Sequence, residues 1–301
     1  MFLVSCTGCS NEKLPRPADA SDRTPREAVV EAPKRMDNGA PYRAKLTHGA
    51  ELYIPPWFSP SPAGYDVIIH FHGLGKLQEA NLERSQINAA VVSINHGVGT
   101  EGYSNHFRDA QSFPKLLEET QAEIDKSGRA PSSKIRRVAL SAWSAGFVSV
   151  SQILREPANG DKVDAVLLAD GFFTSFTDPK KRVINTTSLE RFVALVDQAS
   201  KNDKLFGITH TAIPTQNYPS VEETVAKLLE MTSSAKTATN VLGPRKMVET
   251  YVVDRGSFHV KGYEGILAGD HIRQIHAMGE TLWPYLKTRW DASSAPAKTD
   301  K

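Results

Sequence analysis

The sequence predicts an α/β fold in which a mostly parallel β-sheet is covered by helices on both faces. Short, nearly continuous apolar runs, typical of strands buried on both faces, alternate along the chain with stretches whose apolar residues recur at helical spacing. With 301 residues, 40% of them hydrophobic, the chain is long enough to bury one large core. These observations predict a single large domain, expected to span residues 41–291.

The first folded element is expected to be an antiparallel β-hairpin at a sheet edge. Residues 42–46 and 51–54 alternate in polarity around His48-Gly49. Prolines 55, 56, 60 and 62 then enforce a loop. Further strands are expected at 66–71, 91–94, 137–141, 163–169, 204–210 and 248–253. Helices are expected at 113–124, 147–154, 189–199, 221–231 and 272–286, with polar loops at 99–106 and 232–240.

Both ends of the chain are expected to be disordered tails, at 1–40 and 292–301. The first is a proline-rich, charged tether with few apolar side chains. Within it, Leu3-Val4-Ser5-Cys6 resembles a bacterial lipobox, which implies an exported protein with a lipid anchor at Cys6, in the periplasm or at the cell surface. Residues 1–5 are too short for a whole signal peptide, so a truncated signal and the ordinary start of a cytoplasmic protein both stay open.

Charge and cysteine content exclude several classes of function. The formal net charge is +2 and no basic block with interleaved aromatic residues is present, so a nucleic-acid partner is not expected. The two cysteines, Cys6 and Cys9, precede the folded part, which leaves that part without thiolate ligands or disulfides. His70 and His72 share a strand face, yet no carboxylate or cysteine joins them in sequence. We therefore expect no metal and no cofactor.

The most informative stretch lies between the predicted strand at 137–141 and the predicted helix at 147–154. It reads Ala142-Trp143-Ser144-Ala145-Gly146, a small-x-Ser-x-small pattern typical of a nucleophile elbow. Small residues are needed there because the strand and helix backbones nearly touch. Ser144 would then stand at a helix N-terminus, where the N–H of Ala145 can donate to an oxyanion. The alternative interpretation is a simple turn of small residues.

A second motif follows the predicted strand at 66–71. It reads His72-Gly73-Leu74-Gly75 and resembles the oxyanion loop of lipases and esterases. The N–H of Leu74 is the expected second oxyanion donor. The alternative is a glycine-rich turn after a core strand.

Taken together, these motifs and the order of the elements resemble an α/β-hydrolase over residues 42–290. The resemblance implies a serine, an acid and a histidine, in that chain order, at the carboxyl ends of successive strands. Most members carry the acid after the strand that ends here at His210, but residues 211–218 contain no carboxylate. A minority carry it one strand earlier, where Asp170 stands, so Asp170 is the expected acid and Asp178 a weaker substitute. A capping role for Asp170 in an Asp-Gly turn is the alternative.

Two histidines are candidates for the base. His271 opens the last predicted helix behind Asp270, and His259 follows the last predicted strand. We choose His271 and keep His259 as the alternative base, whereas His276 is interpreted as a packed or solvated helix residue. The residues expected to contact substrate are His72, Gly73, Trp143, His96 and Phe172.

The predicted function is hydrolysis of a small-molecule carboxylic ester or amide through an acyl-serine, with Ser144, His271 and Asp170 as the triad. Two alternatives stay open. One is a binding protein that uses the same fold without activity. The other is an acyltransferase in which an alcohol or amine resolves the acyl-serine. The sequence does not predict the oligomeric state.

Overall fold

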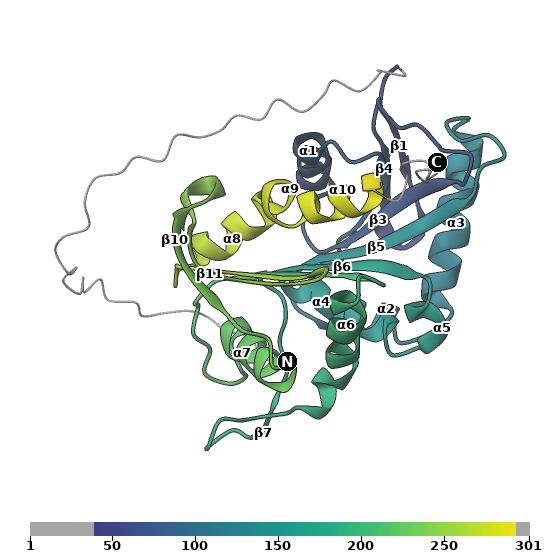
Figure 1. The fold of residues 1–301 in the computed structure, drawn as a ribbon. Helices are drawn as coiled ribbons and strands as arrows, with labels where there is room; N and C mark the ends of the chain where they lie inside the picture. The colour runs from purple at the N-terminus through teal and green to yellow at the C-terminus, as the bar shows by residue number, and fades with distance from the viewer. Residues whose placement is uncertain (1–38, 293–301) are drawn as a thin grey trace, which may run out of the picture. The chain divides into compact units, whose positions relative to one another are not determined.

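The computed structural model describes residues 39–292, whose main feature is a ten-stranded sheet (Figure 1). In sheet order the strands are β1 (Tyr42–Lys45), β2 (Glu51–Ile54), β4 (Ala89–Ile94), β3 (Tyr65–Phe71), β5 (Ile135–Trp143), β6 (Val163–Ala169), β9 (Leu205–His210), β12 (Phe258–Tyr263), β11 (Val248–Arg255) and β10 (Thr237–Leu242). The strands from β4 to β12 in this order pair in parallel, and the outer strands pair antiparallel. This is the α/β-hydrolase fold, so the predicted fold class is confirmed.

The predicted N-terminal hairpin is also confirmed. β1 and β2 pair antiparallel, with Tyr42 opposite Ile54 and Lys45 opposite Glu51. β2 in turn pairs antiparallel with β4, which attaches the hairpin to the parallel part of the sheet.

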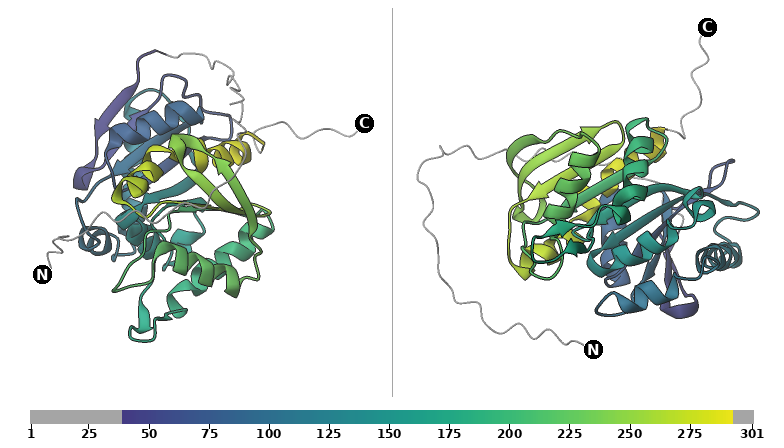
Figure 2. Two further views of the ribbon diagram at one scale, coloured as in Figure 1. Left: turned by 90° about the vertical axis from the view of Figure 1, so that its left-hand side faces the viewer. Right: turned by 90° about the horizontal axis from the view of Figure 1, so that it is seen from below.

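Helices cover both faces of the sheet (Figures 1 and 2). One face carries α2 (Glu101–His106), α3 (Ser112–Lys126), α4 (Phe147–Ile153), α6 (Glu190–Ser200) and α7 (Val221–Met231). The other carries α1 (Gly75–Ser85), α8 (Ala268–His276), α9 (Met278–Thr281) and α10 (Trp283–Ala292). Alternate residues of a strand feed the two cores: Val67 and Ile69 face the first and Ile68 the second. This burial on both faces explains why the strands are apolar throughout.

Several elements differ from the sequence-based expectation. The expected loop at 99–106 contains α2, and the expected loop at 232–240 contains most of β10. The expected long last helix is broken into α8, α9 and α10, and α1 was not predicted. β10 escaped prediction because it is an edge strand with mostly exposed, polar residues, which leaves no alternating apolar pattern to detect.

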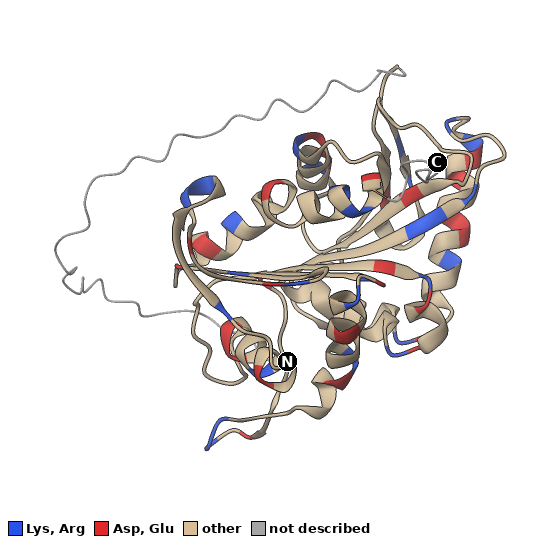
Figure 3. Ribbon diagram, viewed as in Figure 1, with Lys and Arg blue, Asp and Glu red and all other residues tan. Residues whose placement is uncertain are grey.

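Smaller elements lie outside this frame. A separate two-stranded sheet is formed by β7 (Phe176–Asp178) and β8 (Val183–Ile184), and α5 (Pro157–Gly160) is a single turn. Acidic and basic residues are interspersed along the helices and at strand ends (Figure 3).

Among residues 39–292, no helix combines the length and the apolar character that crossing a bilayer requires. Residues 1–38 and 293–301, which make up most of the predicted tails and include the predicted lipid anchor at Cys6, fall outside the described residues, whereas Ala292 is the last residue of α10.

A charged cluster ties the central strands together at their amino ends. Asp66, only 4% exposed, accepts paired hydrogen bonds from the guanidinium groups of Arg136 and Arg137. Asp66 lies near the start of β3 and the two arginines near the start of β5, so the cluster lies at the end of the sheet opposite the carboxyl ends of these strands.

Candidate active site

Ser144 follows the last residue of β5 and adopts a left-handed backbone conformation, with φ of 50°. Such a conformation is uncommon for a residue with a side chain and marks a sharp, strained turn. Two residues later, Gly146 passes so close to β3 that a Cβ there would lie 2.2 Å from the carbonyl oxygen of Phe71. The predicted need for a small residue at this position of the elbow is confirmed.

The predicted acid and histidine meet in the structure. Nδ1–H of His271, in the second turn of α8, donates to Oδ2 of Asp170 over 2.7 Å. The Asp170 side chain is almost fully buried, whereas a quarter of the His271 side chain is exposed. Because a carboxylate only accepts hydrogen bonds, this contact keeps the proton of a neutral imidazole on Nδ1 and leaves Nε2 free to accept another.

The sheet register brings Ser144 and Asp170 to the same edge. β5 and β6 pair in parallel with Trp143 opposite Ala169, so each candidate residue is the first beyond a paired position. Gly171 packs against the serine backbone, since a Cβ there would lie 2.6 Å from the nitrogen of Ser144. Only glycine fits beside the elbow at this position.

Sequence reasoning missed the residue that supports Asp170. Thr211 follows β9, at the place where most α/β-hydrolases carry their acid, and it is buried. Its N–H donates to Oδ1 of Asp170 over 2.9 Å, and its hydroxyl donates to Oδ2 over 2.8 Å. The neighbouring strand therefore contributes donors to the carboxylate instead of a carboxylate of its own. The missing acid at 211–218 was the one signal in the sequence.

Trp143 holds the histidine helix against the elbow. Its ring stacks on His271 at 4.6 Å between centroids and on His72 at 4.9 Å. Its Nε1–H donates to the backbone oxygen of His271 over 3.0 Å. We expected Trp143 to contact substrate, but these contacts identify it first as a residue that positions α8.

The predicted oxyanion loop turns sharply at the end of β3. His72 and Gly73 have φ of 74° and 104°, and Leu74 is the residue before α1. Nδ1 of His72 forms a hydrogen bond of 2.7 Å with the hydroxyl of Tyr103. Burial, and secondarily the nearby His271, lowers the pKa of His72, so its ring is held neutral beside the candidate base. The donor roles of Leu74 and Ala145 stay predictions.

A buried chain of hydrogen bonds holds this loop from below. Nε2–H of His70 donates to the carbonyl of His72 over 2.9 Å, and Nδ1 accepts from the hydroxyl of Ser141 over 2.9 Å. Trp283 donates to the same hydroxyl over 3.3 Å. Burial lowers the pKa of His70 to about 3, so the ring is neutral. Because both of its ring nitrogens are hydrogen-bonded, His70 is a structural residue of β3 that supports the loop.

Within residues 39–292, no cluster of histidine, cysteine or carboxylate side chains could hold a metal ion.

The alternative base, His259, lies elsewhere. Residues 258–263, which follow the last predicted strand, form β12, and His259 is its second residue, toward the amino ends of the parallel strands. Its Nδ1 bonds Asp254 over 2.6 Å and its ring stacks on Tyr285 at 3.9 Å. Since Ser144 follows a carboxyl end, His271 is the candidate histidine that the fold brings to the elbow.

Other predicted contact residues are only partly at the site. Phe172 is fully buried among Phe147, Phe192 and Phe206, which corrects its assignment to substrate contact. His96 is partly exposed, and its backbone N–H donates to the hydroxyl of Tyr103 over 3.0 Å. Because Tyr103 is also hydrogen-bonded to His72, one residue separates His96 from the predicted oxyanion loop.

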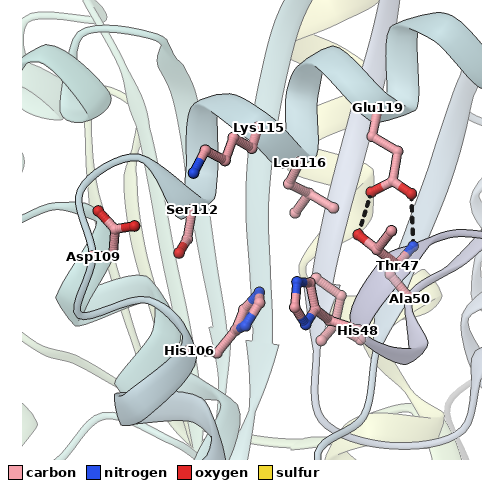
Figure 4. Close-up of a pocket in the computed structure, with 10 residues that line it drawn as sticks. Thr47, His48, Ala50, His106, Asp109, Ser112, Lys115, Leu116 and Glu119 are labelled. Carbon is pink, nitrogen blue, oxygen red and sulfur yellow. Dashed lines mark hydrogen bonds between the residues drawn. The ribbon is translucent and has the colours of Figure 1, made fainter.

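A separate hollow of about 320 Å³ lies between the turn after β1 and the start of α3 (Figure 4). Its side chains include His48 and His106, whose rings lie 4.4 Å apart, and Lys115. Glu119 accepts hydrogen bonds from the N–H and hydroxyl of Thr47 and so fastens the hairpin turn to α3. None of the residues that line this hollow is one that the sequence predicts for catalysis.

Comparisons with known proteins find similarity in structure only. No protein-family model matches the sequence, and no curated protein matches it. The chain is similar to a mutant of the feruloyl esterase module from Clostridium thermocellum complexed with sinapinate, at 12% identity and a TM-score of 0.45, over 81% of this chain and 86% of that one. It is also similar to a fungal esterase from Rhizomucor miehei, at 14% identity and a TM-score of 0.42, over 89% and 86% of the two chains. At these identities and TM-scores the similarity assigns no role to any residue of the candidate site.

Proposed function

We propose that the protein is a serine hydrolase that cleaves a carboxylic ester or amide of a small molecule through an acyl-serine intermediate. One observation carries the proposal. The hydrogen-bonded pair of Asp170 and His271 lies at the same sheet edge as the strained elbow of Ser144, and Gly171, which follows the acid, packs against the serine backbone. Three groups from β5, β6 and α8 thus converge in the chain order expected of a triad.

In this proposal the hydroxyl of Ser144 attacks the substrate carbonyl carbon while Nε2 of His271 takes the proton. The imidazolium is stabilised by Asp170. The N–H groups of Leu74 and Ala145 stabilise the oxyanion, and loss of one such donor costs about 3 kcal/mol in the barrier. His271 then returns the proton to the leaving alcohol or amine. Water, activated by the same imidazole, releases the acid and restores Ser144.

The test is covalent labelling with a fluorophosphonate probe followed by peptide mapping. We expect label on Ser144 in wild type, none in Ser144→Ala, and strongly slowed labelling in His271→Ala. His259→Ala is the matched control, because it removes an equally hydrogen-bonded histidine at the other end of the sheet. Intact, folded wild type that takes up no label would refute the proposal in favour of a binding protein. Transfer of the acyl group to an added alcohol or amine in preference to water would make the enzyme an acyltransferase.

A further inference from the structure

The large hydrophobic side chains that remain exposed are concentrated at the candidate active site. Among residues 39–292 there are nine of them. Three belong to strands away from the site, namely Val183 in β8 and Val241 and Leu242 in β10. The other six all follow the carboxyl end of a parallel strand. This group, here called the apolar rim, consists of Leu74, Val98, Tyr218, Ile266, Leu267 and Ile272.

Two residues of the rim adjoin residues of the candidate site. Ile272 follows the candidate base His271, and Leu74 follows Gly73, where a Cβ would lie 2.3 Å from Cδ1 of Ile275 in α8. Ile272 thus lies in α8, and Leu74 follows a residue that packs against the same helix. Their exposed fractions are 65% and 48%.

The other rim residues lie in segments linked to the candidate acid and to the predicted oxyanion loop. The carbonyl of Gly265, next to Ile266, accepts a 3.0 Å hydrogen bond from the N–H of Ala212, and the preceding Thr211 holds Asp170. The ring of Tyr218 lies 6.2 Å from that of Phe173, in the loop that follows Asp170. Val98 follows Gly97, whose carbonyl accepts a hydrogen bond from the hydroxyl of Tyr103. The same hydroxyl is hydrogen-bonded to His72.

A surface of this kind is unfavourable in water unless something apolar covers it. The molecule that must come to this edge is the substrate of Ser144. We propose that the apolar rim binds an extended apolar acyl group, so that the enzyme acts on monomeric esters of longer aliphatic or aromatic acids in preference to acetyl esters. This inference rests on the proposed function and adds the substrate class.

The experiment compares kcat/KM for p-nitrophenyl octanoate and p-nitrophenyl acetate, the octanoate below its aggregation concentration. We expect the octanoate-to-acetate ratio to be well above one in wild type. We expect Ile266→Ser with Leu267→Ser to lower it about tenfold, the usual scale for lost apolar contact to substrate. The matched control, Val241→Ser with Leu242→Ser, removes two exposed apolar side chains from β10, away from the site, and should leave the ratio unchanged.

Several results would overturn the inference. A wild-type ratio near one, or a ratio that the rim variants do not change, would show that the rim does not bind the acyl group. Octanoate turnover only above the aggregation concentration would assign the rim to a lipid surface. A change in sedimentation coefficient of the rim variants would assign it to contact between two copies of the chain. Wild type that is labelled at Ser144 but does not prefer octanoate over acetate would refute only the proposed role of the rim. Wild type that is not labelled and hydrolyses neither ester would refute the hydrolase proposal and, with it, the role of the rim.

Discussion

Replacing Asp170 by asparagine tests the site most sharply, because the structure dictates how the new amide must lie. The N–H of Thr211 points at Oδ1 from a fixed backbone, so the amide oxygen has to face it. The amide NH₂ then occupies the place of Oδ2 and points at Nδ1 of His271. Nδ1 must accept this hydrogen bond, which moves the imidazole proton to Nε2, where it blocks proton transfer from Ser144.

The expected loss in kcat for Asp170→Asn is about 10⁴-fold, equivalent to about 5.5 kcal/mol in the barrier. KM should change little, since the substitution preserves shape and does not reach the substrate. The assay is p-nitrophenyl ester hydrolysis with burst titration of active sites. Asp178→Asn is the control, because Asp178 also accepts backbone N–H groups, from Lys180 and Lys181, but lies in β7. An Asp170→Asn enzyme within tenfold of wild type, beside an impaired Asp178→Asn, would refute the assignment of the acid.

Three further outcomes are expected. Thr211→Val removes the hydroxyl that donates a hydrogen bond to Asp170. A hydrogen bond to a charged group is worth about 1.5–3 kcal/mol, so we expect kcat to fall roughly 10- to 100-fold and to recover in Thr211→Ser. Equal kcat values in wild type and both variants would contradict this expectation. Asp66→Ala removes the buried carboxylate that pairs with both Arg136 and Arg137, and it should lower the free energy of unfolding by about 3 kcal/mol in urea titrations, without reducing kcat per folded molecule. His70 stays neutral in the folded state down to a pH of about 3, while the unfolded chain protonates it below a pH of about 6.5. The unfolded state therefore binds more protons in this window, and the free energy of unfolding decreases as the pH is lowered through it. This contributes about 2 kcal/mol between pH 7 and pH 5, and the pH slope of urea stability should be shallower in His70→Gln; an unchanged slope would contradict it.

The elements that the sequence predicts well are those whose signal is local. The small residues around Ser144 are required by steric limits within a single turn, so this turn could be predicted without knowledge of the fold. Asp170 was predicted from the resemblance to α/β-hydrolases, because residues 211–218 contain no carboxylate and a minority of that family carries its acid one strand earlier. Its roles and those of Ser144 and His271 in catalysis stay predictions for the labelling and kinetic experiments.

What the sequence hides depends on register and packing. Thr211 supports Asp170 only because β6 and β9 are neighbours, a pairing that no pattern within either strand specifies. His70 and Ser141 meet because β3 and β5 place them opposite each other. β12 escaped prediction because Lys261 and Gly262 interrupt its apolar residues, which made His259 look like a loop residue after the last strand. Trp143 looked like part of a pocket because its stacking partners come from β3 and α8.

The register of β5 and β6 has a consequence for how the site is built. Ser144 and Asp170 extend from the same rung of adjoining strands, so backbone hydrogen bonds of the central sheet fix their separation. His271 alone arrives from a different layer, on a helix clamped by Trp143 and by the side chain of Asp170. Two members of the site are therefore set by the scaffold and one is adjustable. A small shift of α8 would change the geometry at Nε2 while leaving the nucleophile and the acid in place, so alterations in the C-terminal helices offer a route to tune catalysis without disturbing the sheet.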